Sequence, residues 1–291
     1  MFRKLLVATD LSQASERVVC TIGGLKALGA EEALLLHCLN IRDVGTLGPQ
    51  LMELSRDSIE RQAKLLENQG LRVEAKMCLG LPHIEILRQA VDAQCSLIVL
   101  GSQGRSLWAE LFLGGTANAV LQSSTLPVLL LHLKMALAEG RTVCEEIQCN
   151  PLRHVLYPTD FSDTAERAFG YVEEIVKRGG RRVSLCHVQD KGRLLGESQS
   201  ALEEYNRIDR ERLKRLEQRL RDLGATEVAI ELLSGAPKQE IVQLARRGDY
   251  SILVMGTQGR GFFGGILMGS VAFHVARNVT LPILFVPPSQ A

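Results

Sequence analysis

The sequence predicts an α/β protein of two tandem doubly wound domains, each a parallel sheet with helices on both faces. First, blocks in the second half of the 291-residue chain repeat blocks of the first half in the same order, which indicates a domain duplication. Second, both halves alternate short apolar runs with helical patterns, as parallel sheets require. Third, this length favours about two domains of roughly 150 residues each.

The repeat keeps its register over long stretches. The segment LLVATDLSQASERVV around Asp10 matches VLYPTDFSDTAERAF around Asp160, and GLPHIEILRQA matches GAPKQEIVQLA further along. We therefore expect a first domain at residues 1–136, a linker at 137–152 and a second domain at 153–291.

The first elements follow from local patterns. Lys4–Thr9 is short and nearly all apolar, which is typical of a strand covered on both faces. Ser12 is a suitable N-cap for the helix that follows. Ala33–Leu39 is a second apolar strand, and the next helix, at roughly 50–69, ends before Gly70.

The rest of the first half continues this alternation. Val73–Leu79 is the third predicted strand, Ile84–Ala93 a helix and Leu97–Leu100 the fourth strand. Thr116–Ser123 is a short helix that leads to a fifth strand at Pro127–Leu131.

The second half repeats this order with one longer helix. Its strands are expected near 154–158, 182–188, 227–233, 251–255 and 282–286. The long helix, about 198–223, carries an approximate apolar stripe, and we interpret its many charges as a solvated face.

The charge balance excludes two classes of partner. The chain has 34 basic and 33 acidic residues and a net charge of +1, whereas a general nucleic-acid or membrane-surface binder would carry a basic excess. Apolar runs long enough to span a bilayer are also lacking in the sequence. We therefore expect neither a nucleic acid nor a membrane as partner.

A glycine turn follows the fourth strand in both halves. In the second half, Gly256 and Gly259 precede Gly269 and Ser270, which open a short helix. Glycine permits positive φ and lets backbone N–H groups approach a phosphate, and a helix N-terminus favours an anion. The turn thus predicts a phosphate cradle, although the same glycines could simply form tight turns.

Two better-known glycine motifs do not fit. Gly259, Gly261 and Gly264 form G-x-G-x-x-G, but after the fourth strand and without a later acidic residue to hold a ribose. A P-loop would need a lysine that this turn lacks. Arg105 and Arg260, which follow the second glycine of each turn, either contact phosphates or point into solvent.

Asp10 and Asp160 end the first strand of each half, at the edge where such sheets bind ligands. Each carboxylate could accept hydrogen bonds from an adenine amine or a ribose hydroxyl, or could form a helix cap or turn. His37 and His187 lie inside apolar strands and are interpreted as core histidines. Because no catalytic set recurs at matching positions in both halves, we assign no catalytic residues. Cys144 and Cys149 in the predicted linker could bind a metal, but two ligands without histidine spacing do not indicate a site, so we assign no metal-binding residues.

These blocks together resemble the universal stress protein (UspA) family over nearly the whole chain. The pattern is G-x-x-G-x9-G-[ST] after a fourth strand, T-D-x-S after the first and L-P-[VI] at the fifth. The resemblance implies an adenine nucleotide alpha hydrolase-like sheet of order 3-2-1-4-5 and a cytoplasmic protein. It also implies ATP, ADP or AMP as ligand, with magnesium held only through the phosphates.

The resemblance also implies a set of binding residues. In the second half, Pro158, Thr159, Asp160 and Val188 would surround the adenosine, and Met255, Gly256, Gly259, Gly269, Ser270 and Val271 the ribose and phosphates, with Arg260 as a further candidate. In the first half, the matching residues are Ala8, Thr9, Asp10, Cys38, Leu100, Gly101, Gly104, Gly114, Gly115 and Thr116.

The first half departs from the family pattern. Gly115 stands at the position of Ser270, so the hydroxyl is missing. Leu107 stands at the position of Gly261, and Cys38 at that of Val188 near the expected base. We therefore expect weaker nucleotide binding there, or none, although Thr116 could substitute for the missing hydroxyl.

The sequence therefore predicts an adenine-nucleotide-binding regulatory protein of the stress response, without efficient turnover. A slow ATPase or autokinase and a nucleotide-free interaction scaffold are the alternatives. The family also associates through the fifth strand, which implies an internal pseudo-dimer and a possible homodimer.

Overall fold

The computed structural model describes residues 1–102, 113–132, 150–192, 198–260 and 268–289. The contacts divide the chain into two compact units, Met1–Asn150 and Pro151–Ala291. Most of the predicted linker, 137–152, lies outside the described residues, so its limits stay a prediction.

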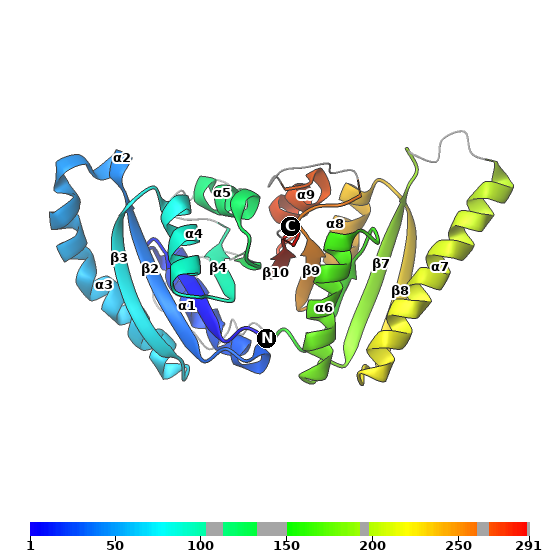
Figure 1. The fold of residues 1–291 in the computed structure, drawn as a ribbon, viewed down its shortest axis with the longest axis horizontal. Helices are drawn as coiled ribbons and strands as arrows, with labels where there is room; N and C mark the ends of the chain where they lie inside the picture. The colour runs from blue at the N-terminus through cyan, green and yellow to red at the C-terminus, as the bar shows by residue number, and fades with distance from the viewer. Residues whose placement is uncertain (103–112, 133–149, 193–197, 261–267, 290–291) are drawn as a thin grey trace. The chain divides into compact units, whose positions relative to one another are not determined.

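The first unit contains five parallel strands in the order β3-β2-β1-β4-β5 (Figure 1). The strands are β1 (Lys4–Thr9), β2 (Glu32–Asn40), β3 (Arg72–Gly80), β4 (Leu97–Gly101) and β5 (Val128–Leu131). The helices are α1 (Gln13–Thr21), α2 (Ile41–Val44), α3 (Gly48–Asn68), α4 (Pro82–Asp92) and α5 (Gly115–Ser123), with 3₁₀ turns at Ile22–Leu28 and Gly45–Leu47. The predicted strand order is confirmed.

The second unit repeats this topology as β8-β7-β6-β9-β10. The strands are β6 (Val155–Pro158), β7 (Arg182–Asp190), β8 (Glu227–Gly235), β9 (Ile252–Gly256) and β10 (Ile283–Val286). The helices are α6 (Asp163–Lys177), α7 (Gln199–Asp222), α8 (Pro237–Arg247) and α9 (Ser270–Asn278).

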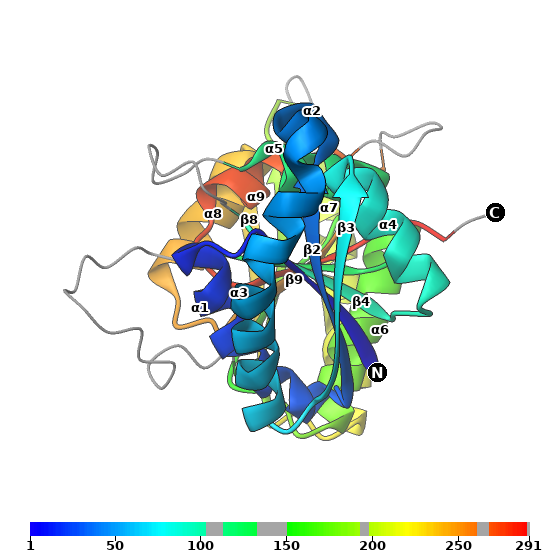
Figure 2. The same ribbon diagram turned by 90° about the vertical axis from the view of Figure 1, so that its left-hand side faces the viewer.

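Helices cover both faces of each sheet. Helices α1 and α3 pack together on one face of the first sheet and α4 and α5 on the other, while α6 with α7 and α8 with α9 repeat this division. Figure 2 shows α3 and α4 on opposite sides of β2 and β3. Every residue of β5, β6, β9 and β10 is buried, as expected for strands of a parallel sheet that has helices on both faces.

Helix ends follow the sequence signals closely. Ser12 and Ser162 cap α1 and α6, since each hydroxyl accepts a hydrogen bond from the backbone N–H three residues later. Gly70 and Gly224 follow α3 and α7 with φ of 82° and 103°, the left-handed conformation that ends a helix.

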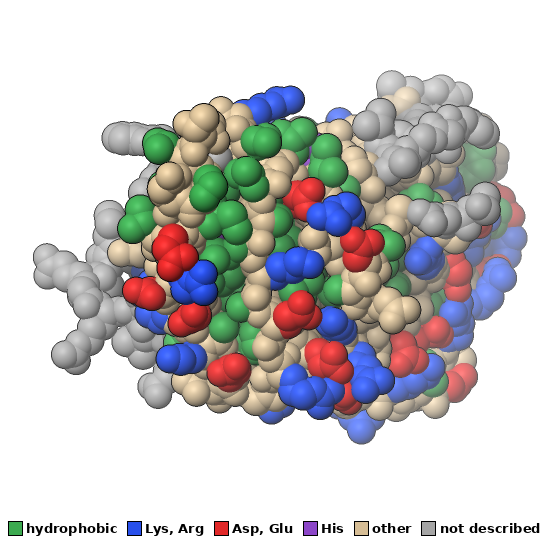
Figure 3. Space-filling view, turned by 60° about the vertical axis from the view of Figure 1, so that its left-hand side comes forward, with side chains coloured by type: hydrophobic (Ala, Val, Ile, Leu, Met, Phe, Trp, Pro, Cys, Tyr) green, Lys and Arg blue, Asp and Glu red, His purple; other side chains and the backbone are tan. Residues whose placement is uncertain are grey.

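The surface carries mixed charge. On the face shown in Figure 3, Lys and Arg side chains are interspersed with Asp and Glu, in keeping with the near-zero net charge. None of the helices that the structure describes is long and apolar enough to cross a membrane.

Candidate functional site in the second half

The winding of the second sheet reverses beside β6. The chain runs from β6 to β7 and β8 on one side, and then returns to β9 on the other side of β6. Loops that leave two neighbouring strands in opposite directions open a crevice at their carboxyl ends, which is where such sheets bind ligands.

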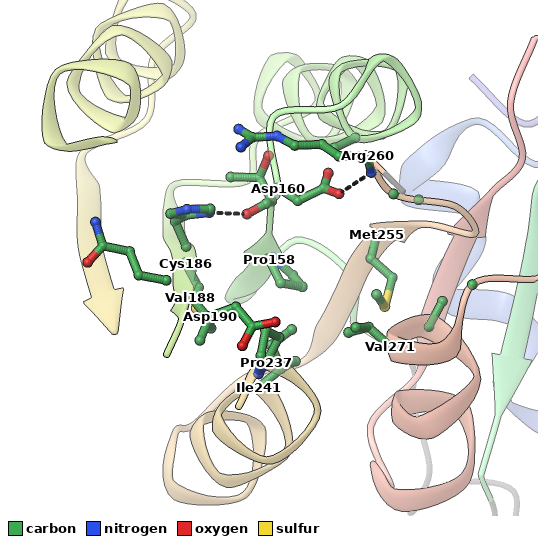
Figure 4. Close-up of a pocket in the computed structure, with 18 of the residues that line it drawn as sticks. Pro158, Asp160, Cys186, Val188, Asp190, Pro237, Ile241, Met255, Arg260 and Val271 are labelled. Carbon is green, nitrogen blue, oxygen red and sulfur yellow. Dashed lines mark hydrogen bonds between the residues drawn. The ribbon is translucent and has the colours of Figure 1, made fainter. Parts of the chain in front are cut away.

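A cavity of about 690 Å³ lies at this edge (Figure 4). Its lining includes all of the predicted second-half residues, namely Pro158, Thr159, Asp160, Val188, Met255, Gly256, Gly259, Arg260, Gly269, Ser270 and Val271. The structure thus brings together residues from three strand ends and one helix start.

The T-D-x-S segment forms a turn that holds itself in place. The Thr159 hydroxyl accepts the Phe161 N–H at 3.0 Å, and Asp160 Oδ1 accepts the Ser162 N–H and hydroxyl at 3.1 and 2.6 Å. Phe161 has a φ of 59°, and Leu11 in the first half has 61°. Bulky residues rarely adopt this left-handed conformation, so both copies hold a strained backbone at the same point.

The other oxygen of Asp160 joins the two sides of the crevice. Oδ2 accepts the backbone N–H of Arg260 at 2.8 Å, which links the end of β6 to the turn after β9. Asp160 therefore forms a turn, which was one of the two roles predicted for it from the sequence. Oδ1 already accepts two hydrogen bonds, whereas Oδ2 accepts one and has a second lone pair that can accept a hydrogen bond from a ligand hydroxyl.

One of the two expected reasons for the motif glycines, positive φ, is wrong. Gly256, Gly259 and Gly269 do not have positive φ in the structure. Instead, a β-carbon at Gly256 would lie 2.9 Å from the Thr164 side chain, and one at Gly259 would collide with Asp160 Oδ2. These glycines are required because the turn packs closely against the start of α6 and against the Asp160 carboxylate.

Helix α9 begins at the rim of the cavity. Its N-cap, Gly269, donates its N–H to Thr257 O at 2.7 Å, which fixes the turn before the helix. The N–H groups of Ser270, Val271 and Ala272 belong to the first turn, where a helix provides no backbone acceptors. They line the cavity together with the exposed Ser270 side chain, so this rim favours an anion.

Apolar side chains form much of the cavity lining. Figure 4 shows them at the ends of β6, β7 and β9 and on helices α8 and α9. They are Pro158, Val188, Pro237, Ile241, Met255 and Val271. The cavity therefore combines an apolar wall with an anion-favouring rim.

Arg260 lies exposed at the mouth of the cavity, in agreement with the predicted alternative of a solvent-exposed side chain. Its guanidinium lies 5.5 Å from the Phe161 ring centroid, and that of Arg212 lies at 5.3 Å. Cation–π contacts thus hold two positive charges near this ring.

His187 is a buried core histidine, as predicted. Its Nδ1 donates to Thr159 O at 2.7 Å, and its ring packs on Phe161 with centroids 4.6 Å apart. Burial lowers the pKa of the His187 imidazole, so the ring is neutral near pH 7.

Helix α7 contributes residues that the sequence did not identify. Tyr205, Ile208, Asp209 and Arg212 line the cavity. The Asp209 carboxylate is only 13% exposed and accepts from Gln189 Nε2 at 2.9 Å, which contradicts a wholly solvated charged face. The helical spacing of Tyr205, Asp209 and Arg212 was visible in the sequence, but which helix face overhangs the crevice depends on tertiary packing.

The first half places its predicted residues at the equivalent sheet edge. Ala8 and Thr9 end β1, Asp10 follows it, Cys38 lies near the end of β2, Leu100 and Gly101 end β4, and Gly114, Gly115 and Thr116 start α5. Asp10 Oδ1 accepts the Ser12 N–H at 3.0 Å, and the Gly114 N–H bonds to Ser102 O at 2.8 Å, as in the second half. Gly104, Arg105 and Leu107 lie outside the described residues.

Among the His, Cys, Asp and Glu side chains that the structure describes, no group of three or more lies in a metal-binding arrangement.

Comparisons with known proteins agree on one relationship. A sequence model described as the universal stress protein family matches residues 1–132 and 151–287. A universal stress protein of Mycolicibacterium smegmatis is 26% identical over 98% of this chain and 97% of its own length. Universal stress protein MJ0577 of Methanocaldococcus jannaschii is 29% identical over 46% of this chain and 97% of its own length.

One solved structure matches at full length. A universal stress protein from Archaeoglobus fulgidus DSM 4304 aligns over 98% of both chains, with a TM-score of 0.72 and 24% identity. At that identity, the likeness supports the tandem fold.

Proposed function

Because the chain belongs to the universal stress protein family, we propose that its second half binds an adenine nucleotide and that the protein acts as a regulatory stress-response protein. The observation that carries this proposal is the cavity at the β6–β9 switch point, which has an apolar wall and an anion-favouring helix start. A volume of about 690 Å³ suits a ligand of nucleotide size.

Each part of a nucleotide has a matching part of the cavity. The apolar wall around Val188, Ile241 and Met255 suits the faces of an adenine ring. The N–H groups at the start of α9 and the Ser270 hydroxyl suit a phosphate, and Asp160 suits a ribose hydroxyl. Magnesium, when present, would be held through the phosphates.

The site favours binding over turnover. The neutral ring of His187 already donates its Nδ1 proton to Thr159 O, and Asp160 accepts hydrogen bonds from two backbone groups and one hydroxyl. General-base catalysis needs a group within reach of an attacking water and with a suitable pKa. We therefore propose that any ATP hydrolysis or autophosphorylation is slow.

Isothermal titration with ATP and AMP, after removal of co-purified nucleotide, tests the binding site. Removing the hydroxyl with Ser270→Ala should weaken binding by about 10- to 150-fold, because a hydrogen bond to a charged phosphate contributes about 1.5–3 kcal/mol. Gly115→Ala, at the equivalent first-half position, is the matched control, since a β-carbon there meets open space. Absence of heat for both nucleotides would instead favour an interaction scaffold.

Release of ADP tests turnover separately. We expect rates well below about 1 per second, the lower end for typical enzymes. Faster release that disappears in a Gly259→Ala and Ser270→Ala double variant would contradict the binding-only function and favour the ATPase.

A further inference from the structure

Two cysteines of the first half lie side by side. Cys38 on β2 and Cys78 on β3 are register partners in neighbouring parallel strands, so their side chains project from the same face of the sheet. Both are free thiols and both are partly exposed. Each thiol is the largest single influence on the pKa of the other, so the two act as a pair rather than as two separate cysteines.

The second half shows that this fold does not need cysteines here. Its register partners at the equivalent positions are Val188 and Leu233, an ordinary apolar pair. Since Val188 lines the nucleotide-sized cavity, Cys38 and Cys78 stand at the corresponding crevice of the first half. Packing alone therefore does not account for two thiols at this place.

The spacing of the two strands suits a disulfide. Neighbouring strands lie about 4.8 Å apart, within the range of about 4.4–6.8 Å that the Cα atoms of a disulfide span. Strand β3 is at the edge of its sheet and is hydrogen-bonded to β2 alone. An edge strand can shift more readily than a strand that is hydrogen-bonded on both sides. Such a shift can bring the two Cβ atoms to the separation of about 3.5–4.5 Å that a disulfide needs.

The surroundings of the two thiols make their pKa values differ, so that one of them is the better nucleophile. The interaction with Cys38 lowers the pKa of the Cys78 thiol, and the positive charges of Arg88 and Lys76 act in the same direction, while burial and Glu85 oppose them. The same contact raises the pKa of the Cys38 thiol. Cys78 is therefore the thiol that is more readily deprotonated, and the thiolate is the reactive form.

Two other cysteines lack these features. Cys95 and Cys186 are buried, and burial raises the pKa of their thiols to about 11 and about 12. They provide internal references for an unreactive thiol in the same chain.

We propose that Cys38 and Cys78 are a redox site that a hydroperoxide oxidises to an intrachain disulfide. The Cys78 thiolate attacks a peroxide oxygen, so an S–O bond forms, the O–O bond breaks, and the leaving hydroxide takes a proton to become water. Cys38 then attacks the Cys78 sulfenic acid, so the S–S bond forms and a second water leaves with the Cys38 proton. Two thiols and one hydrogen peroxide thus give one disulfide and two waters.

This site assigns the first half a task that the second half lacks. The disulfide ties β2 to the edge strand β3 beside their carboxyl ends, where the fold places its ligand crevice. Oxidation would then restrict the motion of β3 relative to β2 at that edge of the sheet. A small thiol reductant would reverse it by thiol–disulfide exchange.

Peptide mapping of the full chain tests the proposal. The reduced protein is exposed to hydrogen peroxide, its remaining thiols are alkylated, and it is digested with trypsin. The expected product joins peptide Ala27–Arg42 to peptide Met77–Arg88, each with a single cysteine, and weighs two hydrogen atoms less than the two peptides together. It should form at least about tenfold faster than Cys95 or Cys186 loses its thiol, since their thiolates are scarcer.

The second half supplies the matched variants. A C38V/C78L variant copies the Val188–Leu233 pair and should yield no joined peptide while remaining folded. The reverse V188C/L233C variant tests whether this register is sufficient for a disulfide, and we expect a second joined peptide.

Three results would overturn the proposal. One is alkylation of Cys38 and Cys78 in the wild-type protein after peroxide treatment that has already consumed Cys95 or Cys186. Another is separate oxidation of each thiol to sulfinic acid without a joined peptide. The third is a joined peptide found only in a covalent dimer on a non-reducing gel, which would place the bond between two chains.

Discussion

The contact between Gly259 and Asp160 predicts a large effect from a small change. Gly259→Ala adds one methyl group, and that carbon would collide with Asp160 Oδ2. The same oxygen accepts the Arg260 N–H at 2.8 Å. Ser162 holds Oδ1 in place, so the added methyl group can be accommodated only if Oδ2 moves away from the Arg260 N–H. We therefore expect the hydrogen bond between Asp160 and Arg260 to break.

The size of the effect follows from the bond that is lost. A hydrogen bond to a charged group contributes about 1.5–3 kcal/mol. If a nucleotide needs the turn in its present position, binding must supply that free energy to restore it. The dissociation constant should therefore rise by about 10- to 150-fold.

Titration calorimetry with ATP measures this effect, and circular dichroism verifies that the variant is folded. Gly115→Ala is the control, because it adds the same methyl group where the structure leaves open space. An unchanged dissociation constant for folded Gly259→Ala would refute the reasoning, since the turn would then not need the Asp160–Arg260 bond.

Three further predictions use other contacts. Tyr157→Phe should lower the free energy of unfolding by about 1 kcal/mol in urea titration, because the buried hydroxyl donates to Ala165 O at 2.7 Å; an equal midpoint would contradict this. Gly115→Ser should tighten or create nucleotide binding in the first half, seen as a higher stoichiometry by calorimetry; an unchanged stoichiometry would show that the hydroxyl is insufficient. Burial lowers the pKa of both His154 and His187, so the unfolded chain binds protons that the folded chain does not, and stability should decrease as the pH falls below about 6.5. A urea midpoint that is constant from about pH 7 to about pH 5 would contradict that sign.

The order of elements and the location of the crevice could be predicted from the sequence. Apolar runs identified the strands, Ser12 and Gly70 marked helix ends, and Asp160 with the glycine turn marked the sheet edge where the cavity lies. These signals are local, because hydrogen-bond capping and backbone conformation depend on a few adjacent residues.

Other features depend on contacts between distant segments. The sequence could not show that Gly259 faces the Asp160 carboxylate, so positive φ and access to a phosphate were the reasons that it offered for this glycine. Likewise, Asp209 looked like one of many surface charges on α7 until packing placed it beside Gln189. The left-handed conformation of Phe161 was also not predicted, because bulky residues rarely adopt it and nothing in the local sequence indicates it.

The two register pairs, Cys38–Cys78 and Val188–Leu233, have a consequence for how this protein varies. In a homodimer, one gene encodes both subunits, so every substitution appears at both sites at once. Here the equivalent positions belong to separate stretches of one gene and can diverge independently. Each chain then delivers one thiol pair and one apolar pair, and this one-to-one ratio does not change with expression level or dilution.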